Sequence, residues 1–201
     1  MRLRYLHALA LLALLLSLGA SACRTRPTEG SSTPAAPTLQ TKLDTVFSSP
    51  SGLYTLRYNH SWQVQQIVTE AGVLDLFTLP NATISVETER VPPGTKLDAL
   101  IEQTLAQYRS VNIQGLERAG SINVGGGHGE LVHAVTYVNA QGVTVASAPA
   151  PGSRPRNLSQ AFYLAGTQRF TFSVAWPQGD GTDYMKLFRS ILQTFTLAGT
   201  T

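Results

Sequence analysis

Three histidines in the body of the chain, His60, His128 and His133, are the side chains best suited to bind a metal ion or to transfer protons. A zinc site needs three or four ligands that converge at about 2 Å from the ion. The three histidines do not have the spacing of a ligand cluster. His133 lies among apolar residues, where a hydrogen-bonded strand residue is the commoner outcome. We therefore expect no bound metal and no cofactor. A metal site built from His128, His133 and a carboxylate such as Glu130 is the alternative.

The run Gly125–Gly129, Gly-Gly-Gly-His-Gly, admits two interpretations. Consecutive backbone N–H groups can bind an anion such as phosphate. However, no Lys-Ser or Lys-Thr pair follows, and no helix is predicted to begin there. A hairpin loop that needs positive φ angles accounts for the glycines better.

Nucleophilic catalysis lacks a candidate residue in this sequence. No Gly-x-Ser-x-Gly motif is present, and the only cysteine is Cys23, close to the N-terminus. The carboxylates Asp75, Glu87 and Glu89 fall at strand positions that we predict to be exposed to solvent. These observations favour a protein that is not an enzyme.

Residues 146–157, Ala-Ser-Ala-Pro-Ala-Pro-Gly-Ser-Arg-Pro-Arg-Asn, interrupt the pattern of the domain. Their three prolines argue against a strand interior. We predict a long loop here. Its Arg154 and Arg156 form the candidate site for binding a partner or an acidic ligand. A tolerated insertion without a binding role is the alternative.

The first 23 residues indicate where the protein resides. Arg2 and Arg4 precede an apolar run, Ala8–Leu18, and the small residues 19–22 lead to Cys23. A basic start, a short apolar core and a small-residue cleavage site are typical of a secretory signal. The apolar run is too short to span a bilayer, which takes roughly 20 residues.

A cysteine directly after small residues resembles the lipobox of bacterial lipoproteins, although Ala20 stands where that motif usually has Leu. The resemblance implies that Cys23 becomes the mature N-terminus and carries a diacylglycerol. Two or three acyl chains together anchor a protein stably to a membrane. The alternative is an ordinary secretory signal that is cleaved after Ala22. A single cysteine in an exported chain forms no internal disulfide, which fits the lipid role.

The charge of the mature chain argues against nucleic-acid binding. The whole chain has 15 basic and 12 acidic residues, and cleavage of the signal removes Arg2 and Arg4, which leaves 13 against 12. A nearly neutral surface offers no electrostatic footprint for a nucleic acid.

Composition divides the chain into three parts. Residues 1–22 form the predicted lipoprotein signal peptide. Residues 23–42 are rich in Pro, Ser and Thr and bury too little apolar surface to fold, which predicts a flexible tether. Residues 43–198 are numerous enough for one domain with a hydrophobic core.

Alternation of apolar and polar residues predicts strands along most of the domain. Four segments joined by short turns, 53–58, 62–68, 73–79 and 82–89, are expected to form an antiparallel meander. Further strands are predicted at 113–118, 121–124, 130–139, 143–147, 160–165 and 169–176.

Two segments have helical periodicity. Residues 96–110 carry an amphipathic pattern, and Thr95 with Asp98 resembles a capping box. The last helix follows a cap at 180–183, and its apolar stripe runs from Tyr184 to Phe195. Two such helices and at least six antiparallel strands predict an α+β fold, a sheet with helices packed on it.

Three segments follow one another in a recognisable order: the turn Leu56–Trp62, which holds Asn-His-Ser-Trp, the Gly-containing turn 124–130, and the final motif Phe188–Phe195, Phe-x-x-Ile-Leu-x-x-Phe. In this order they resemble the PsbP-like superfamily. The proline that the family has in the first turn is missing here. The resemblance implies an α/β/α sandwich over about 150 residues. It implies little about function, because the superfamily has no shared chemistry.

The sequence therefore predicts a lipoprotein of the bacterial cell envelope, anchored through Cys23 to the cell membrane or outer membrane. Its domain faces the extracytoplasmic side and acts as a non-catalytic binding or assembly module, with an envelope protein as the expected partner. A small-ligand carrier and a metal-dependent hydrolase that uses His60, His128 or His133 are the alternatives.

Overall fold

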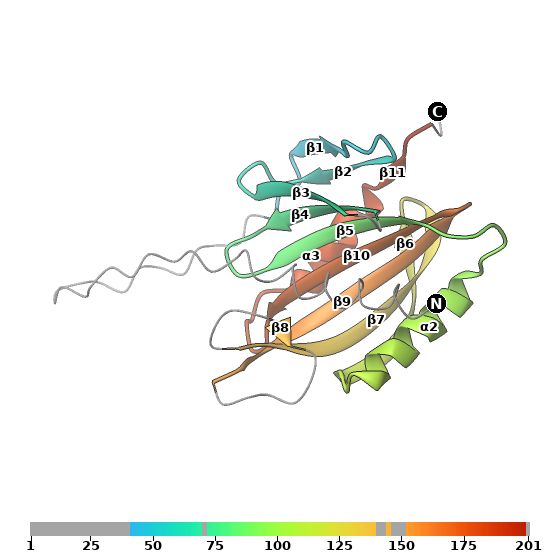
Figure 1. Cartoon of the computed structure of the whole chain (residues 1–201). Helices are drawn as coiled ribbons and strands as arrows, with labels where there is room; N and C mark the ends of the chain where they lie inside the picture. The colour runs from blue at the N-terminus through green and yellow to red at the C-terminus, as the bar shows by residue number, and fades with distance from the viewer. Residues whose placement is uncertain (1–40, 70–71, 140–143, 146–151, 200–201) are drawn as a thin grey trace.

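The computed structural model describes residues 41–69, 72–139, 144–145 and 152–199. The largest part of the fold is an eight-stranded antiparallel sheet with the order β3-β4-β5-β10-β9-β7-β6, in which β8 pairs with β7 (Figure 1). Its strands are β3 (Gln63–Thr69), β4 (Gly72–Thr78), β5 (Thr83–Arg90), β6 (Gln114–Val124), β7 (Gly127–Val138), β8 (Thr144–Val145), β9 (Arg154–Ala165) and β10 (Gln168–Pro177). The predicted signal peptide, Cys23 and most of the tether lie outside the described residues.

A second, three-stranded sheet joins β1 (Thr45–Ser48), β2 (Tyr54–Tyr58) and β11 (Thr196–Leu197). The predicted four-stranded meander is therefore wrong in its first strand, because β2 pairs with β1 and β11 while only β3, β4 and β5 form a meander. The reason is that Tyr54 and Leu56 of β2 are buried in the main core, so β2 packs on the face of the large sheet instead of extending its edge.

The two helices, α2 (Leu97–Ser110) and α3 (Tyr184–Gln193), cover opposite faces of the large sheet. Leu131 of β7 belongs to the core under α3, whereas its neighbour Val132 packs with Ile101 and Leu105 of α2. Because successive strand residues point to opposite faces, these contacts place one helix on each side. The predicted α+β sandwich is confirmed.

Helix α3 forms where the sequence predicts it. The side chain of Asp183 accepts a hydrogen bond from Lys186 N at 2.9 Å, which caps the first turn. Its buried stripe packs on the aromatic side chains of β10, and Phe195 beyond its end contacts Phe170 and Phe172 at ring-centroid distances of 5.2 and 5.0 Å.

Helix α2 also forms at the predicted place, but its predicted capping box is wrong. The N-cap residue is Lys96, whose side chain makes no capping hydrogen bond. Thr95 precedes the N-cap, and its Oγ1 donates to the carbonyl of Pro92 instead of capping the helix. The side chain of Asp98 forms an ion pair with Arg118 of β6 instead of bonding to the start of the helix, and Arg118 Nη2 lies 2.6 Å from Asp98 Oδ1.

Candidate functional site

The glycine run forms the tip of the β6–β7 hairpin. Gly125 and Gly126 have φ angles of +56° and +84°, the left-handed conformation that favours glycine at both central positions of a tight hairpin turn. A Cβ on Gly125 would also lie 2.1 Å from the carbonyl oxygen of Phe195. The predicted hairpin loop is therefore confirmed.

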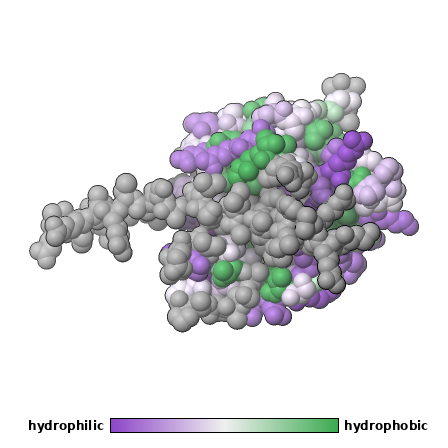
Figure 2. Space-filling view, viewed as in Figure 1, coloured by the Kyte–Doolittle hydropathy of each residue, from purple (hydrophilic) through white to green (hydrophobic). Residues whose placement is uncertain are grey.

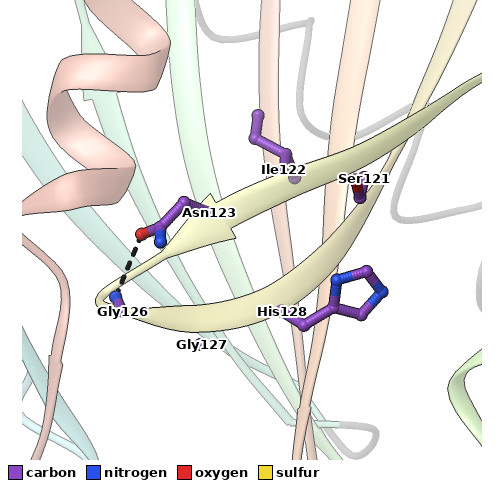
Figure 3. A pocket seen from close by; sticks show the side chains of 6 residues that line it. All are labelled: Ser121, Ile122, Asn123, Gly126, Gly127 and His128. Carbon is purple, nitrogen blue, oxygen red and sulfur yellow. Dashed lines mark hydrogen bonds between the residues drawn. The ribbon is translucent and has the colours of Figure 1, made fainter.

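A shallow pocket lies beside this turn (Figure 3). Two backbone amides at the tip are already bonded, because Gly126 N donates to Asn123 Oδ1 at 3.0 Å and Gly125 N donates to the carbonyl of Leu192 at 2.9 Å. These amides are not available to hold a phosphate. The pocket is lined by Ser121, Ile122, Asn123, Gly126, Gly127 and His128.

The histidines of β7 lie on opposite faces of the sheet. His128 shares a face with Glu130, whose Oε1 is 3.3 Å from His128 Nε2. His133 points to the α3 side, where its Nδ1 is 2.7 Å from Ser159 Oγ. Burial lowers the pKa of His133, since it removes water from the imidazolium form. The structure therefore does not bring His128, His133 and Glu130 together, and the described residues contain no group of three metal-ligating side chains.

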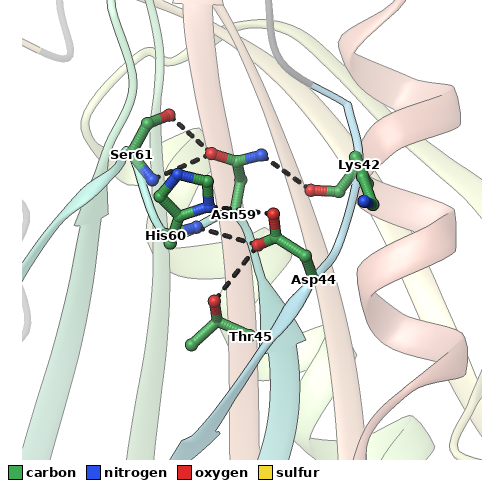
Figure 4. A network of polar contacts seen from close by, with 6 residues as sticks. All are labelled: Lys42, Asp44, Thr45, Asn59, His60 and Ser61. Atoms are coloured by element: carbon green, nitrogen blue, oxygen red, sulfur yellow. Dashed lines mark hydrogen bonds and ion pairs between the residues drawn. The ribbon is translucent and has the colours of Figure 1, made fainter.

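His60 takes part in a network that fixes the turn between β2 and β3 (Figure 4). Asn59 Oδ1 accepts hydrogen bonds from Ser61 N and Oγ, while Asn59 Nδ2 donates to the carbonyl of Lys42. The carboxylate of Asp44 contacts His60 Nδ1 at 2.8 Å, and this bond lowers the pKa of Asp44 to about 2. The network attaches the incoming chain to the turn, so a structural role accounts for His60.

Arg118 of β6 connects α2 to the hairpin through three carboxylates. Its guanidinium lies 2.6 Å from Asp98, 3.5 Å from Glu102 and 3.1 Å from Glu130. One Arg cannot neutralise three carboxylates, so this corner is acidic. Because its members bond to one another, the group has a structural explanation.

The predicted loop at 146–157 is wrong for its last residues. Strand β9 begins at Arg154, and Pro155 pairs with Tyr137 of β7. The carbonyl of Pro155 points toward β10 and accepts a hydrogen bond from Gln178 N, just beyond the end of that strand. The backbone nitrogen of Pro155 is on the same side, where the pairing of β9 with β10 has ended, so no strand partner needs the N–H that proline lacks. Arg156 Nη2 donates to the carbonyl of Ala175 at 2.9 Å. Residues 146–151 lie outside the described residues, and partner binding by the two arginines stays a prediction.

Of the three carboxylates that we predicted to be exposed, Asp75 is buried, and Glu87 and Glu89 are half-buried. Asp75 is 0% exposed, and it accepts hydrogen bonds from Tyr54 Oη at 2.5 Å, Ser49 Oγ at 2.8 Å and Gln66 Nε2 at 2.8 Å. The alternation of β4 points Asp75 to the α3 side, where the small sheet covers it. Burial raises the pKa of Tyr54, so its hydroxyl remains a donor. This cluster joins the two sheets.

Glu87 and Glu89 belong to a group of polar side chains on the α2 side of the central strands, which we call the polar patch. Three successive cross-strand pairs of β5 and β10 are polar on this face: Ser85 with Ser173, Glu87 with Thr171, and Glu89 with Arg169. Gln160 of β9 completes the patch. Helix α2 contacts β6, β7 and β9, and Figure 1 shows no helix of the described chain over β3, β4 and β5 on this side.

The hydrogen bonds within the polar patch are incomplete. Tyr108 of α2 donates to Gln160 Oε1, Gln160 Nε2 donates to Ser173 Oγ at 3.0 Å, and Arg169 Nη2 lies 2.5 Å from Glu89 Oε2. In contrast, Thr171 Oγ1 and Arg169 Nε are buried without a hydrogen-bond partner, and the Thr171 residue is only 5% exposed. Buried polar atoms are normally bonded, so these two atoms mark the patch as the candidate binding site.

Burial raises the pKa of Glu87, and nearby Glu89 adds to the shift while Arg169 opposes it. Above pH 4.5, the usual pKa of a glutamate side chain, folding therefore takes up a proton. The free energy of unfolding then falls as the pH rises from 4.5 through the raised pKa of the folded state. We expect Glu87→Gln to be more stable than the wild type at pH 7.5 and equally stable at pH 3.5. Urea unfolding at both pH values measures this.

The matched control for this prediction is Glu117→Gln, on the exposed part of β6, which we expect to lack the gain in stability at pH 7.5 that Glu87→Gln shows. A Glu87→Gln variant that is less stable than the wild type at pH 7.5 would show that the ionised carboxylate is bonded and would contradict the prediction.

The polar patch was missed because we treated β5 as a strand with one solvated face. The sequence contains the pattern that marks this patch. Thr83, Ser85 and Glu87 alternate with the apolar residues Ile84 and Val86, and residues 169, 171 and 173 alternate with Phe170 and Phe172 in β10. Both strands occupy the centre of the sheet, where polar residues on both neighbours are unusual.

Comparison of the sequence with protein-family models and with curated proteins gave no match. The structure resembles cyanobacterial PsbP (CyanoP) from Synechocystis, with a TM-score of 0.53 and 13% identity over 84% of this chain and 98% of that one. It also resembles a Bacteroides thetaiotaomicron protein, with a TM-score of 0.51 and 13% identity over 78% of this chain. This chain spans about half, 49%, of the length of that protein.

A third similar structure is LpqN of Mycobacterium tuberculosis, which is involved in cell envelope biogenesis. Its TM-score is 0.48 at 10% identity, over 72% of this chain and 83% of that one, which is too low to carry an inference. The likeness to CyanoP defines the class: this is an α+β protein with a PsbP-like fold. Within the described residues, no helix has the length and apolar character needed to cross a membrane.

Proposed function

We propose that this protein is a lipid-anchored lipoprotein of the cell envelope whose PsbP-like domain binds a ligand outside the cytoplasm without catalysing a reaction. The apolar run Ala8–Leu18 and Cys23 support export and anchoring. The tether at 23–42 separates the anchor from the domain.

The observation that carries the binding role is the unsatisfied polar patch. A buried hydroxyl without a partner costs about 1–3 kcal/mol, and Thr171 sits in a central strand where an apolar residue would fit. A bound molecule that bonds Thr171 Oγ1 and Arg169 Nε would offset that cost. This favours the small-ligand carrier among the binding roles, with a polar molecule held against the sheet beside α2.

The binding role is tested by native mass spectrometry of the full protein purified from its own envelope in mild detergent. We expect a small molecule to remain bound to the wild type and to be lost from Thr171→Val. Thr88→Val is the control, because Thr88 is buried in the same sheet but faces the α3 side, where its hydroxyl bonds to the carbonyl of Val73. A wild-type protein that carries no small molecule contradicts the proposal.

Anchoring is tested separately by Cys23→Ser. We expect this variant to move from the membrane fraction to the soluble fraction, because the lipid on Cys23 is the anchor that we propose. Its melting temperature should stay that of the wild type. Thr25→Ala, two residues further on, should remain with the membrane. A Cys23→Ser protein that still sediments with membranes after signal cleavage would refute lipid attachment.

A further inference from the structure

The large sheet has two edges, and they differ in how they are protected from pairing with another chain. The edge strand β6 contains two register shifts against β7 and carries Glu117 and Arg118. Bulges and charges are the usual means of blocking an edge. In the small sheet, the edge strands β1 and β11 are only four and two residues long.

Edge strand β3 has none of these protections. Its sequence, Gln-Val-Gln-Gln-Ile-Val-Thr, contains no charged residue and no proline, and it pairs with β4 over seven consecutive residues without a bulge. The backbone groups on its outer side have no partner among the described elements. A long, regular, uncharged edge is able to pair with another strand.

The exposed apolar residues point to the same edge. Only two large hydrophobic side chains are exposed in the described chain, Val46 and Val68, and Val68 of β3 is 73% exposed. Figure 2 shows hydrophobic surface at the part of the molecule that holds β3 and β4. Val68 and Val64 lie on the α3 side of β3, and Val64 is partly buried against the core.

We propose that β3 pairs in antiparallel fashion with β3 of a second copy of this chain, which joins two large sheets into one. The sequence of β3 is self-complementary about Gln66: in that register Gln66 lies opposite its own counterpart, and Val64 lies opposite Val68 of the second copy. Each exposed Val68 would then be covered by a valine, and the Gln66 side chains would face each other.

A second copy fits this edge better than an unrelated strand for two reasons. Like charges directly opposite each other destabilise an antiparallel pair, and β3 has no charge to repel its own copy. The pairing is also closed, since a two-fold contact uses the same edge on both subunits. Each end of the joined sheet is then the opposite edge of one copy, formed by the bulged β6 and the two-residue β8. The product is therefore a dimer and not a fibre.

Disulfide formation tests the proposal in the full chain in membranes. Residues opposite each other in an antiparallel pair have Cα atoms about 5 Å apart, a distance that a disulfide spans. Mild oxidation of Gln66→Cys is therefore expected to give a band at twice the mass of the chain. The wild type, whose only cysteine is Cys23, measures the background.

Two variants test the register and the surface. In Val68→Cys the two thiols would be separated by four residues along the strand, roughly 13 Å, so little dimer is expected. Adding Val68→Lys to Gln66→Cys places a charge on the edge and should remove most of the dimer band, without harm to folding because Val68 is exposed.

Three outcomes overturn the proposal. The first is that oxidised Gln66→Cys gives no more dimer than the wild type. The second is that Val68→Cys gives as much dimer as Gln66→Cys, which would indicate random collision. The third is that Gln66→Cys forms its disulfide with a different protein. Because Gln66→Cys also removes the hydrogen bond to Asp75, its melting temperature is expected to fall somewhat. The variant must still give the circular dichroism spectrum of the folded protein under reducing conditions, so that a negative result reflects the edge and not unfolding.

Discussion

Phe188→Ala is expected to lower the free energy of unfolding by about 3–5 kcal/mol, the usual cost of removing a buried aromatic ring. Phe188 is 0% exposed and lies on the stripe of α3 that packs on the large sheet. That stripe also supports the small sheet, because α3 contacts both β10 and β2. Leu192→Ala, one turn later on the same stripe, should cost about 2–5 kcal/mol. Urea unfolding of the purified protein measures both losses.

Arg189→Ala is the matched control for these substitutions. Arg189 is adjacent to Phe188 in the same helix but is exposed, so we expect a change within about 0.5 kcal/mol. If Phe188→Ala and Leu192→Ala also stay within that range, α3 is not the element that seals the core, and the assignment of its buried face is wrong.

Helix α3 illustrates what the sequence predicts well. Its apolar residues recur at helical spacing for more than two turns and its cap is a local side-chain bond, so both signals are contained in one segment. The glycine run is similar, because positive φ angles at two adjacent residues limit the backbone to a tight turn. Residues within one segment are therefore enough to predict such elements.

Errors arose where a distant segment decides the outcome. Strand β2 has the same alternation as β3, but whether it extends the large sheet or packs on it depends on Tyr54 reaching Asp75 in β4. The strand that begins at Arg154 is hidden in the sequence by Pro155, which is tolerated because β10 ends there. Neither fact is visible in the residues adjacent to the segment.

The candidate site was missed for the same reason. Alternation shows that Glu87 and Asp75 each lie on one face of a strand, but it does not show which faces are covered. Asp75 is covered by the small sheet, and Glu87 becomes part of a patch only because β10 places Thr171 beside it. A polar residue in a central strand is therefore better treated as a site candidate than as solvated charge.

Asp75→Ala is expected to destabilise the protein by about 3 kcal/mol or more. The substitution removes the common acceptor of three side chains and leaves the buried hydroxyl of Tyr54 without its partner. Each buried polar group left unsatisfied costs about 1–3 kcal/mol. Because Asp75 links the two sheets, we also expect the small sheet to lose protection from hydrogen exchange before the large sheet does.

The Tyr54→Phe variant and the Asp75→Asn variant separate this network from simple loss of volume. Asn fills the same space and still accepts from Gln66 Nε2, so Asp75→Asn should cost less than Asp75→Ala. If Tyr54 and Asp75 act through their 2.5 Å hydrogen bond, the double variant should be more stable than the sum of the single losses predicts. Additive losses would mean that the hydroxyl and the carboxylate stabilise the domain independently, and that packing of the Tyr54 ring on Phe170 and Phe195 holds the two sheets together.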